Sequence, residues 1–223
     1  MSAHRPLRVV GLGAGGHAKV IIEILQSDGQ VELVGLLDSN PTMTGKRVLG
    51  VPVLGPDPML ERLVNQGVTH FFVGAGSTGH TSLRRRLHET ATALGVIPLA
   101  AIHPQAVVSR SARLGPGCQL MAGAIVNAEA TLGASVCVNT GAIVEHDCRV
   151  GNHAYIATGA RLGGTVSVGE GAFVGAGATI RQSVAIGAGA IVGAGAVVVA
   201  DVPAGETVVG VPAKPLHRRY ARH

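Results

Sequence analysis

The residues best suited to chemistry are three adjacent polar side chains, Glu145, His146 and Asp147, in the stretch GAIVEHDCRVGN (141–152). Their neighbours are small and aliphatic, and only 14% of the chain is charged. A histidine can act as a general acid or base near neutral pH, and a neighbouring carboxylate can stabilise its imidazolium form. The triplet is therefore either a site or a solvated corner.

A glycine-rich turn near the N-terminus is a second candidate site. Gly11, Gly13 and Gly16 have the G-x-G-x-x-G spacing of dinucleotide-binding turns, and Asp38 follows the next predicted strand. Backbone N–H groups at a helix start can hold a phosphate, and Asp38 can accept hydrogen bonds from ribose or base. A domain of only about a hundred residues favours a mononucleotide-sized ligand over a dinucleotide. The alternative is a tight strand–helix turn that binds nothing.

The elements that would position this turn alternate between strand and helix. Strands are expected at 7–12, 31–37, 51–55 and 69–76. Helices are expected at 18–29, 57–67 and 81–95, the second of them capped by Asp57. The alternation predicts a small parallel α/β sheet.

The C-terminal half has a six-residue repeat. From Val108 to Val198 every sixth residue is aliphatic, sixteen positions in all, and a small residue follows four positions after each. Glycine comes directly after many of the aliphatics, where we expect it to relieve a turn. A period of six suits neither a helix nor a simple strand, but it suits a short strand and a corner repeated many times. The pattern is typical of hexapeptide β-helices.

That repeat resembles the left-handed parallel β-helix, in which three hexapeptides form one triangular coil. Residues eighteen apart then lie one above another, about 4.8 Å apart as neighbouring strands are. Gly164 is therefore expected one coil from His146, where the missing side chain leaves room for a thin ligand.

Composition narrows the class of partner. The 223 residues include 33 glycines and no tryptophan, and the net charge is +5. Basic residues gather in LRRRL (83–87) and in KPLHRRYARH (214–223). They favour anionic partners such as nucleotides or coenzyme A, unless they are only a solvated helix face and tail. Two Tyr and three Phe are scattered, so no nucleic-acid partner is expected.

The location is predicted from what the sequence lacks. Cys118, Cys137 and Cys148 form no C-x-x-C pair, which suits a reducing compartment. No apolar signal region opens the chain and no run of 18 residues is apolar throughout. We expect a soluble cytoplasmic protein with no membrane partner. A zinc hydrase would need about three histidine ligands, which His146 and His153 do not supply, so no metal is expected.

Over essentially its whole length the chain resembles the sialic-acid-type acetyltransferase family, which includes bacterial nucleotide-sugar N-acetyltransferases. The matching segments are GAGGH (13–17), LLD (36–38), AIHP (101–104), NTGAIVEHDC (139–148) and VVGVPAKPL (208–216). The resemblance implies a small Rossmann-like nucleotide-sugar-binding domain (1–104). A left-handed β-helix acetyltransferase domain with a C-terminal coil would follow (105–223). It also implies a homotrimer with its sites between subunits.

The family pattern assigns roles to individual residues. His146 would be the general base, Asp147 would hydrogen-bond and polarise its ring, and Asn139 would line the same cleft. The nucleotide sugar would be held by Gly15, Gly16, His17, Asp38 and Gly76. Acetyl-coenzyme A would contact Tyr155, Gly164, Ala176, Ala194, Pro212 and Lys214. Tyr155 stands where many relatives have a histidine; its phenol can donate a hydrogen bond but cannot become a cation.

The predicted reaction is acetyl-coenzyme A-dependent N-acetylation of a nucleotide-linked 4-amino-4,6-dideoxy sugar, without a metal or a covalent intermediate. Two alternatives remain: sialic-acid-type O-acetylation of a sugar hydroxyl, and a non-catalytic trimeric module that binds nucleotide sugars. Uridine, guanosine and thymidine carriers are all open.

Overall fold

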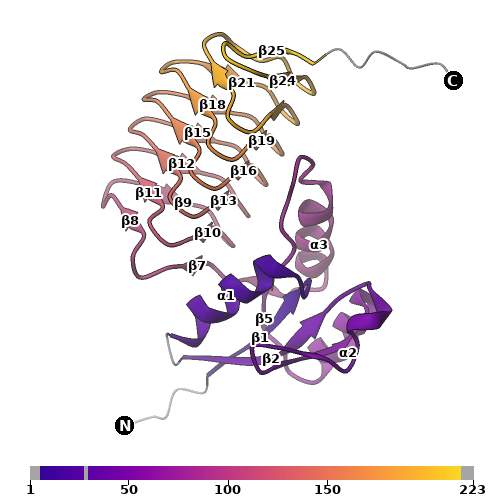
Figure 1. Ribbon diagram of the computed structural model, residues 1–223. Coiled ribbons are helices and arrows are strands. Elements are labelled where there is room, and N and C mark those ends of the chain that lie inside the picture. The colour runs from indigo at the N-terminus through magenta and orange to yellow at the C-terminus, as the bar shows by residue number, and fades with distance from the viewer. Residues whose placement is uncertain (1–5, 28–29, 217–223) are drawn as a thin grey trace, which may run out of the picture.

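The computed structural model describes residues 6–27 and 30–216, in two parts that pack on each other (Figure 1). The basic tail beyond Leu216 lies outside the described residues, as do His217 and His223. No helix in the described ranges has the length and apolar character needed to span a membrane.

The N-terminal part is a six-stranded sheet in the order β3-β4-β2-β1-β5-β6. Its strands are β1 (Leu7–Leu12), β2 (Val31–Leu37), β3 (Arg47–Val48), β4 (Val51–Gly55), β5 (His70–Val73) and β6 (Ile97–Pro98). Only β3 runs antiparallel to its neighbour. The helices are α1 (Gly16–Gln26), α2 (Leu60–Asn65) and α3 (Ser82–Ala93), with 3₁₀ turns η1 (Pro41–Met43) and η2 (Asp57–Met59).

Alternation along β1 sends side chains into two different cores. Val9 packs in the core that α1 covers, whereas Val10 packs in the core shared by α2 and α3. The sheet therefore carries helices on both faces, and the predicted parallel α/β sheet is confirmed.

The predicted helix over 57–67 differs from the structure. Its first turn is the 3₁₀ turn η2, and the α-helix α2 begins only at Leu60. The prediction that Asp57 caps this helix is wrong, because Pro56 occupies the N-cap of η2 and no side chain makes a cap hydrogen bond there. The Asp57 side chain lines a cavity instead.

The C-terminal part is a left-handed parallel β-helix whose three faces are three sheets. The β7 face consists of β7 (Ala101–Ile102), β10 (Gln119–Leu120), β13 (Cys137–Val138), β16 (Tyr155–Ile156), β19 (Phe173–Val174), β22 (Ile191–Val192), β24 (Thr207–Val209) and β25 (Lys214–Pro215). The β8 face consists of β8 (Val107–Val108), β11 (Ile125–Val126), β14 (Ile143–Val144), β17 (Arg161–Leu162), β20 (Thr179–Ile180) and β23 (Val197–Val198). The β9 face consists of β9 (Arg113–Leu114), β12 (Thr131–Leu132), β15 (Arg149–Val150), β18 (Ser167–Val168) and β21 (Ala185–Ile186).

Register confirms the coil of eighteen residues. Ile125 pairs with Ile143, and Ile143 pairs with Arg161 one coil further on. From β10 to β23 the second residue of each two-residue strand points inward, and the aliphatic series is buried from Leu120 to Val198. Strand β7 pairs with β10, so the first strand of the β-helix lies just before residue 105. The domain limits of 1–104 and 105–223 stay a prediction.

Two kinds of glycine shape the coil: those that directly follow an inward aliphatic residue and those in the turns. A Cβ on Gly175, which directly follows an inward aliphatic, would lie 2.6 Å from the backbone N of Ala194 in the next coil. Such glycines permit close stacking and do not relieve the turn, contrary to the expectation. The turn is made two residues later, as at Gly177 with φ +67°, where a left-handed backbone favours glycine.

The two parts share one core and several polar contacts. Apolar side chains of α1 pack with Tyr155 and Phe173 of the β7 face. Thr81 Oγ1 donates to the Gly171 carbonyl at 2.8 Å, and Arg85 pairs with Glu170 at 2.7 Å. These contacts hold the N-terminal α/β domain against the β7 face of the β-helix (Figure 1).

Candidate active site

The His146 corner, the row of turns between the β8 and β9 faces, carries the predicted base. His146 Nδ1 lies 2.8 Å from Asp147 Oδ2, and both side chains are more than half exposed. With Nδ1–H donating to the carboxylate, Nε2 is left as the proton acceptor. A Cβ on Gly164 would lie 2.6 Å from Nε2, so the predicted stacking of these two residues is observed. The corner presents a basic nitrogen against a side-chain-free wall.

Local backbone geometry holds this pair together. Asp147 adopts φ +59°, a left-handed conformation that Asp tolerates better than most residues. Its N–H donates to the Ala128 carbonyl at 3.0 Å. Glu145 has a different task, because its Oε2 accepts from Asn127 Nδ2 at 2.9 Å, one coil away. Of the polar triplet, His146 and Asp147 form a hydrogen-bonded pair, and Glu145 ties neighbouring coils together.

The Asn139 corner, the row of turns between the β7 and β8 faces, is a second and separate edge. Asn139 Nδ2 donates to the Tyr155 hydroxyl at 3.0 Å. Burial raises the pKa of the Tyr155 phenol, so it stays protonated. Within one chain Asn139 does not share a cleft with His146, since the whole β8 face separates their corners.

The predicted coenzyme contacts divide between these edges. Gly164 lies at the His146 corner, whereas Ala176 and Ala194 stack one coil apart at the Asn139 corner. Lys214 pairs with Val209 in the β24–β25 hairpin that closes the last coil, and Pro212 lies in the turn between those strands. One chain therefore does not bring the six predicted residues into one site.

The glycine-rich turn opens onto a cavity of about 260 Å³. Gly15, Asp38 and Gly76 line it, and Gly16 begins α1 beside it. Asp38 was expected to bind ribose or base. Its oxygens already accept from Ala14 N at 2.7 Å and Asn40 N at 2.9 Å, so it also shapes the turn. The helix start offers N–H groups to an anion.

His17 points from this turn into the joint between the two parts. Its Nε2 lies 2.8 Å from Gln119 Oε1, and the same oxygen accepts from Arg84 Nη2 at 2.8 Å. Gln119 Nε2 donates to the Val73 carbonyl at 2.8 Å. Burial, and then the nearby Arg84 charge, lower the pKa of His17 to about 4. The ring is therefore neutral at physiological pH.

Sequence reasoning missed Arg84 and Gln119. Arg84 is 1% exposed although it belongs to the basic run that was interpreted as a solvated face or an anion site. The available signal is spacing: Arg84, Leu87, His88 and Ala91 are the buried residues of α3, and they lie on one helical stripe.

A metal site and a cysteine nucleophile are two other kinds of site that the described residues can be checked for. No group of three His, Cys, Asp or Glu could hold a metal ion in the part of the chain that the structure describes. His153 is buried with its ring 5.1 Å from that of His88, away from the His146 corner. Burial raises the pKa of Cys118, Cys137 and Cys148 to about 11, so these thiols are not nucleophiles.

Two family models match the chain. The PglD N-terminal domain matches residues 8–91, and the bacterial transferase hexapeptide model (six repeats) matches residues 165–200. The comparison with curated proteins found no match. Fold and site together define an acyltransferase of the hexapeptide-repeat class.

Solved structures extend the match to the whole chain. GDP-perosamine N-acetyltransferase from Caulobacter crescentus, crystallised as a histidine-to-alanine variant with CoA and GDP-perosamine, is 45% identical. The match covers 94% of this chain and 96% of that one, with a TM-score of 0.88. The acetyltransferase domain of PglB from Neisseria gonorrhoeae is 40% identical over 94% of this chain and 100% of that one, with a TM-score of 0.87. The chain belongs to this family of CoA-dependent nucleotide-sugar N-acetyltransferases, and the predicted resemblance is confirmed.

Proposed function

We propose that this enzyme transfers an acetyl group from acetyl-coenzyme A to the amino group of a nucleotide-linked 4-amino-4,6-dideoxy sugar. The observation that carries the proposal is the His146–Asp147 pair, held at 2.8 Å with its free nitrogen against Gly164. Whole-chain relatives support it, since one was crystallised with CoA and GDP-perosamine and another with acetyl coenzyme A.

The chemistry follows from the geometry of the pair. His146 Nε2 takes the proton of the sugar amine as that nitrogen attacks the thioester carbonyl. Asp147 keeps Nδ1 protonated and stabilises the imidazolium that forms. A backbone N–H of the glycine-lined wall would hold the developing oxyanion. The carbon–sulfur bond then breaks, and the His146 imidazolium gives its proton to the departing sulfur, so coenzyme A leaves as the thiol. Much of the acceleration comes from holding two ligands side by side.

The complete site would need two copies of the chain. The predicted coenzyme contacts lie on two corners at opposite edges of the β8 face. The outward residues of that face are mostly apolar: Val107, Ile125, Ile143, Arg161, Thr179 and Val197. The β9 face is polar by comparison, with Arg113, Thr131, Arg149 and Ser167 outward. A second copy on the β8 face would bring its Asn139 corner to the first copy's His146 corner, and three copies close the ring.

The test is thiol release from acetyl-coenzyme A. The acceptors would be GDP-, UDP- and dTDP-linked 4-amino-4,6-dideoxy sugars, with GDP-linked sugars first because of the Caulobacter relative, and free sialic acid as the rival. We expect turnover with a nucleotide amino sugar, and a loss of about 10²- to 10⁴-fold in His146→Ala. Turnover with sialic acid alone would favour O-acetylation, and no turnover from a folded protein would favour the binding module.

We further propose a homotrimer that works in the cytoplasm. Its three cysteines are buried free thiols, which suits a reducing compartment. Sedimentation of the purified protein measures the trimer directly.

A further inference from the structure

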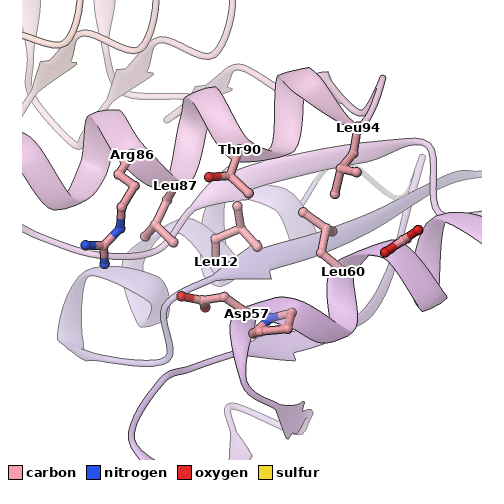
Figure 2. Close-up of a pocket in the computed structure, with 9 residues that line it drawn as sticks. Leu12, Asp57, Leu60, Arg86, Leu87, Thr90 and Leu94 are labelled. Carbon is pink, nitrogen blue, oxygen red and sulfur yellow. The ribbon is translucent and has the colours of Figure 1, made fainter.

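A second cavity lies next to the one at the glycine-rich turn. Its volume is about 310 Å³, and the two cavities share Asp57 and Leu87 in their walls. Figure 2 shows it between α3 on one side and η2 and α2 on the other. A ligand whose phosphates lie at the start of α1 therefore has room to extend past Asp57 into this second space.

The second cavity has largely apolar walls. Its walls include Leu12 of β1, Leu60 of α2, Leu87 of α3 and Leu94, which directly follows α3 (Figure 2). Apolar walls with a few polar groups are typical of sites that bind small organic molecules. The start of α1 supplies the N–H groups for phosphate, which leaves the leucine-walled space for the base.

Two groups of opposite charge face the leucine-walled space. Figure 2 shows the Asp57 carboxylate directed toward the side where Arg86 lies. They do not form an ion pair within 4.0 Å in the described part of the chain, and no described group donates a hydrogen bond to Asp57. Burial, and then the Asp38 charge, raise the pKa of Asp57, whereas Arg86 lowers it. The Asp57 carboxylate is thus partly desolvated, and both of its oxygens can accept hydrogen bonds from a ligand.

Base chemistry distinguishes the carriers at such a pair. Guanine offers two adjacent donors, N1–H and the N2 amino group, which match both oxygens of a carboxylate, and its O6 and N7 accept from a guanidinium. Uracil and thymine offer one N–H between two carbonyl oxygens, and those oxygens would repel a carboxylate. We propose that Asp57 and Arg86 select a guanine base in the nucleotide-linked substrate, an inference that rests on the proposed function.

The test measures binding of free nucleotides by calorimetry, so it does not depend on turnover. The wild-type protein is expected to bind GDP about ten- to a hundredfold more tightly than UDP. In Asp57→Asn one oxygen is replaced by an N–H donor, so GDP should weaken by a similar factor. Xanthosine diphosphate, whose O2 accepts where guanine donates, should become the preferred ligand of that variant.

Two further variants sharpen the result. Arg86→Met should weaken GDP without improving xanthosine diphosphate. Glu61→Gln removes another carboxylate from the same cavity and should leave the preference for GDP intact.

Equal affinity of the wild type for GDP and UDP, no nucleotide binding at all, or an Asp57→Asn variant that still prefers GDP over xanthosine diphosphate would each overturn the inference. A protein that binds GDP selectively but releases no thiol from acetyl-coenzyme A would overturn the proposed reaction and leave the base selection standing.

Discussion

At residue 164 the absence of a side chain gives the His146 ring its open face. A methyl group there would lie 2.6 Å from Nε2, closer than real Cβ contacts allow, so the ring would have to move. We expect Gly164→Ala to lower kcat/KM about 10²-fold with little change in Tm, because small misplacements of a catalytic group are costly. Thiol release and thermal melting measure both.

Gly79→Ala is the matched control, since a Cβ at Gly79 meets nothing within 4 Å. Normal turnover in Gly164→Ala would mean that the position of the His146 ring against Gly164 does not matter for the reaction.

Asp147 is the second residue whose charge the proposed chemistry uses. Asp147→Asn keeps a hydrogen-bonding group beside Nδ1 and suits the left-handed backbone, but it removes the charge that stabilises the imidazolium. We expect kcat to fall about 10- to 10²-fold, with the KM for acetyl-coenzyme A unchanged. Steady-state kinetics separate the two constants. An unchanged kcat would limit Asp147 to a structural role.

At the scale of elements, α1, α3 and strand β10 meet at the buried joint of His17, Arg84 and Gln119. The pKa of His17 falls from 6.5 to about 4 on folding. Between pH 6.5 and about pH 4, His17 therefore binds a proton in the unfolded chain but not in the folded chain. The contribution of neutral His17 to the free energy of unfolding is fully present above pH 6.5 and is lost as the pH falls from 6.5 toward 4.

Urea unfolding of wild type and His17→Gln at pH 7 and pH 4 tests this sign. We expect the wild type to lose on the order of 3 kcal/mol more than the variant between the two pH values. Gln cannot be protonated yet can still donate to Gln119. Equal losses would show that His17 is protonated freely in the folded protein.

At the scale of the whole molecule, the apolar β8 face is where copies of the chain would meet. Ile143 points outward at the middle of that face. A buried unpaired charge destabilises an interface strongly, so we expect Ile143→Glu to yield folded monomers with less than about a hundredth of the activity. Sedimentation velocity and thiol release measure the two effects.

Thr131→Glu on the polar β9 face is the control and should remain assembled and active. A trimer that survives Ile143→Glu with full activity would place the subunit contact elsewhere.

Much of the architecture could be read from local pattern. The aliphatic period of six determined the coil, and stacking of His146 under Gly164 follows because a regular coil turns distance along the chain into height. The strands at 7–12 and 31–37 have the predicted bounds, since buried runs of aliphatics favour strands. The prediction that Asp57 caps a helix was wrong because it used only the local sequence, whereas the Asp57 side chain faces a cavity.

What the sequence determined by itself are the repeat, the α/β domain before it and the histidine–carboxylate pair, because all three depend on neighbours in the chain or on a fixed period. Only the tertiary structure decided that Arg84 is buried against Gln119, that Asp57 and Arg86 face one cavity, and that Asn139 and His146 lie on different edges. Those relations join segments far apart in sequence. Arg84 meets Gln119 because the N-terminal domain packs on the β7 face. Asp57 and Arg86 face one cavity because α3 lies opposite η2. Asn139 and His146 are separated because the β-helix has a triangular cross-section.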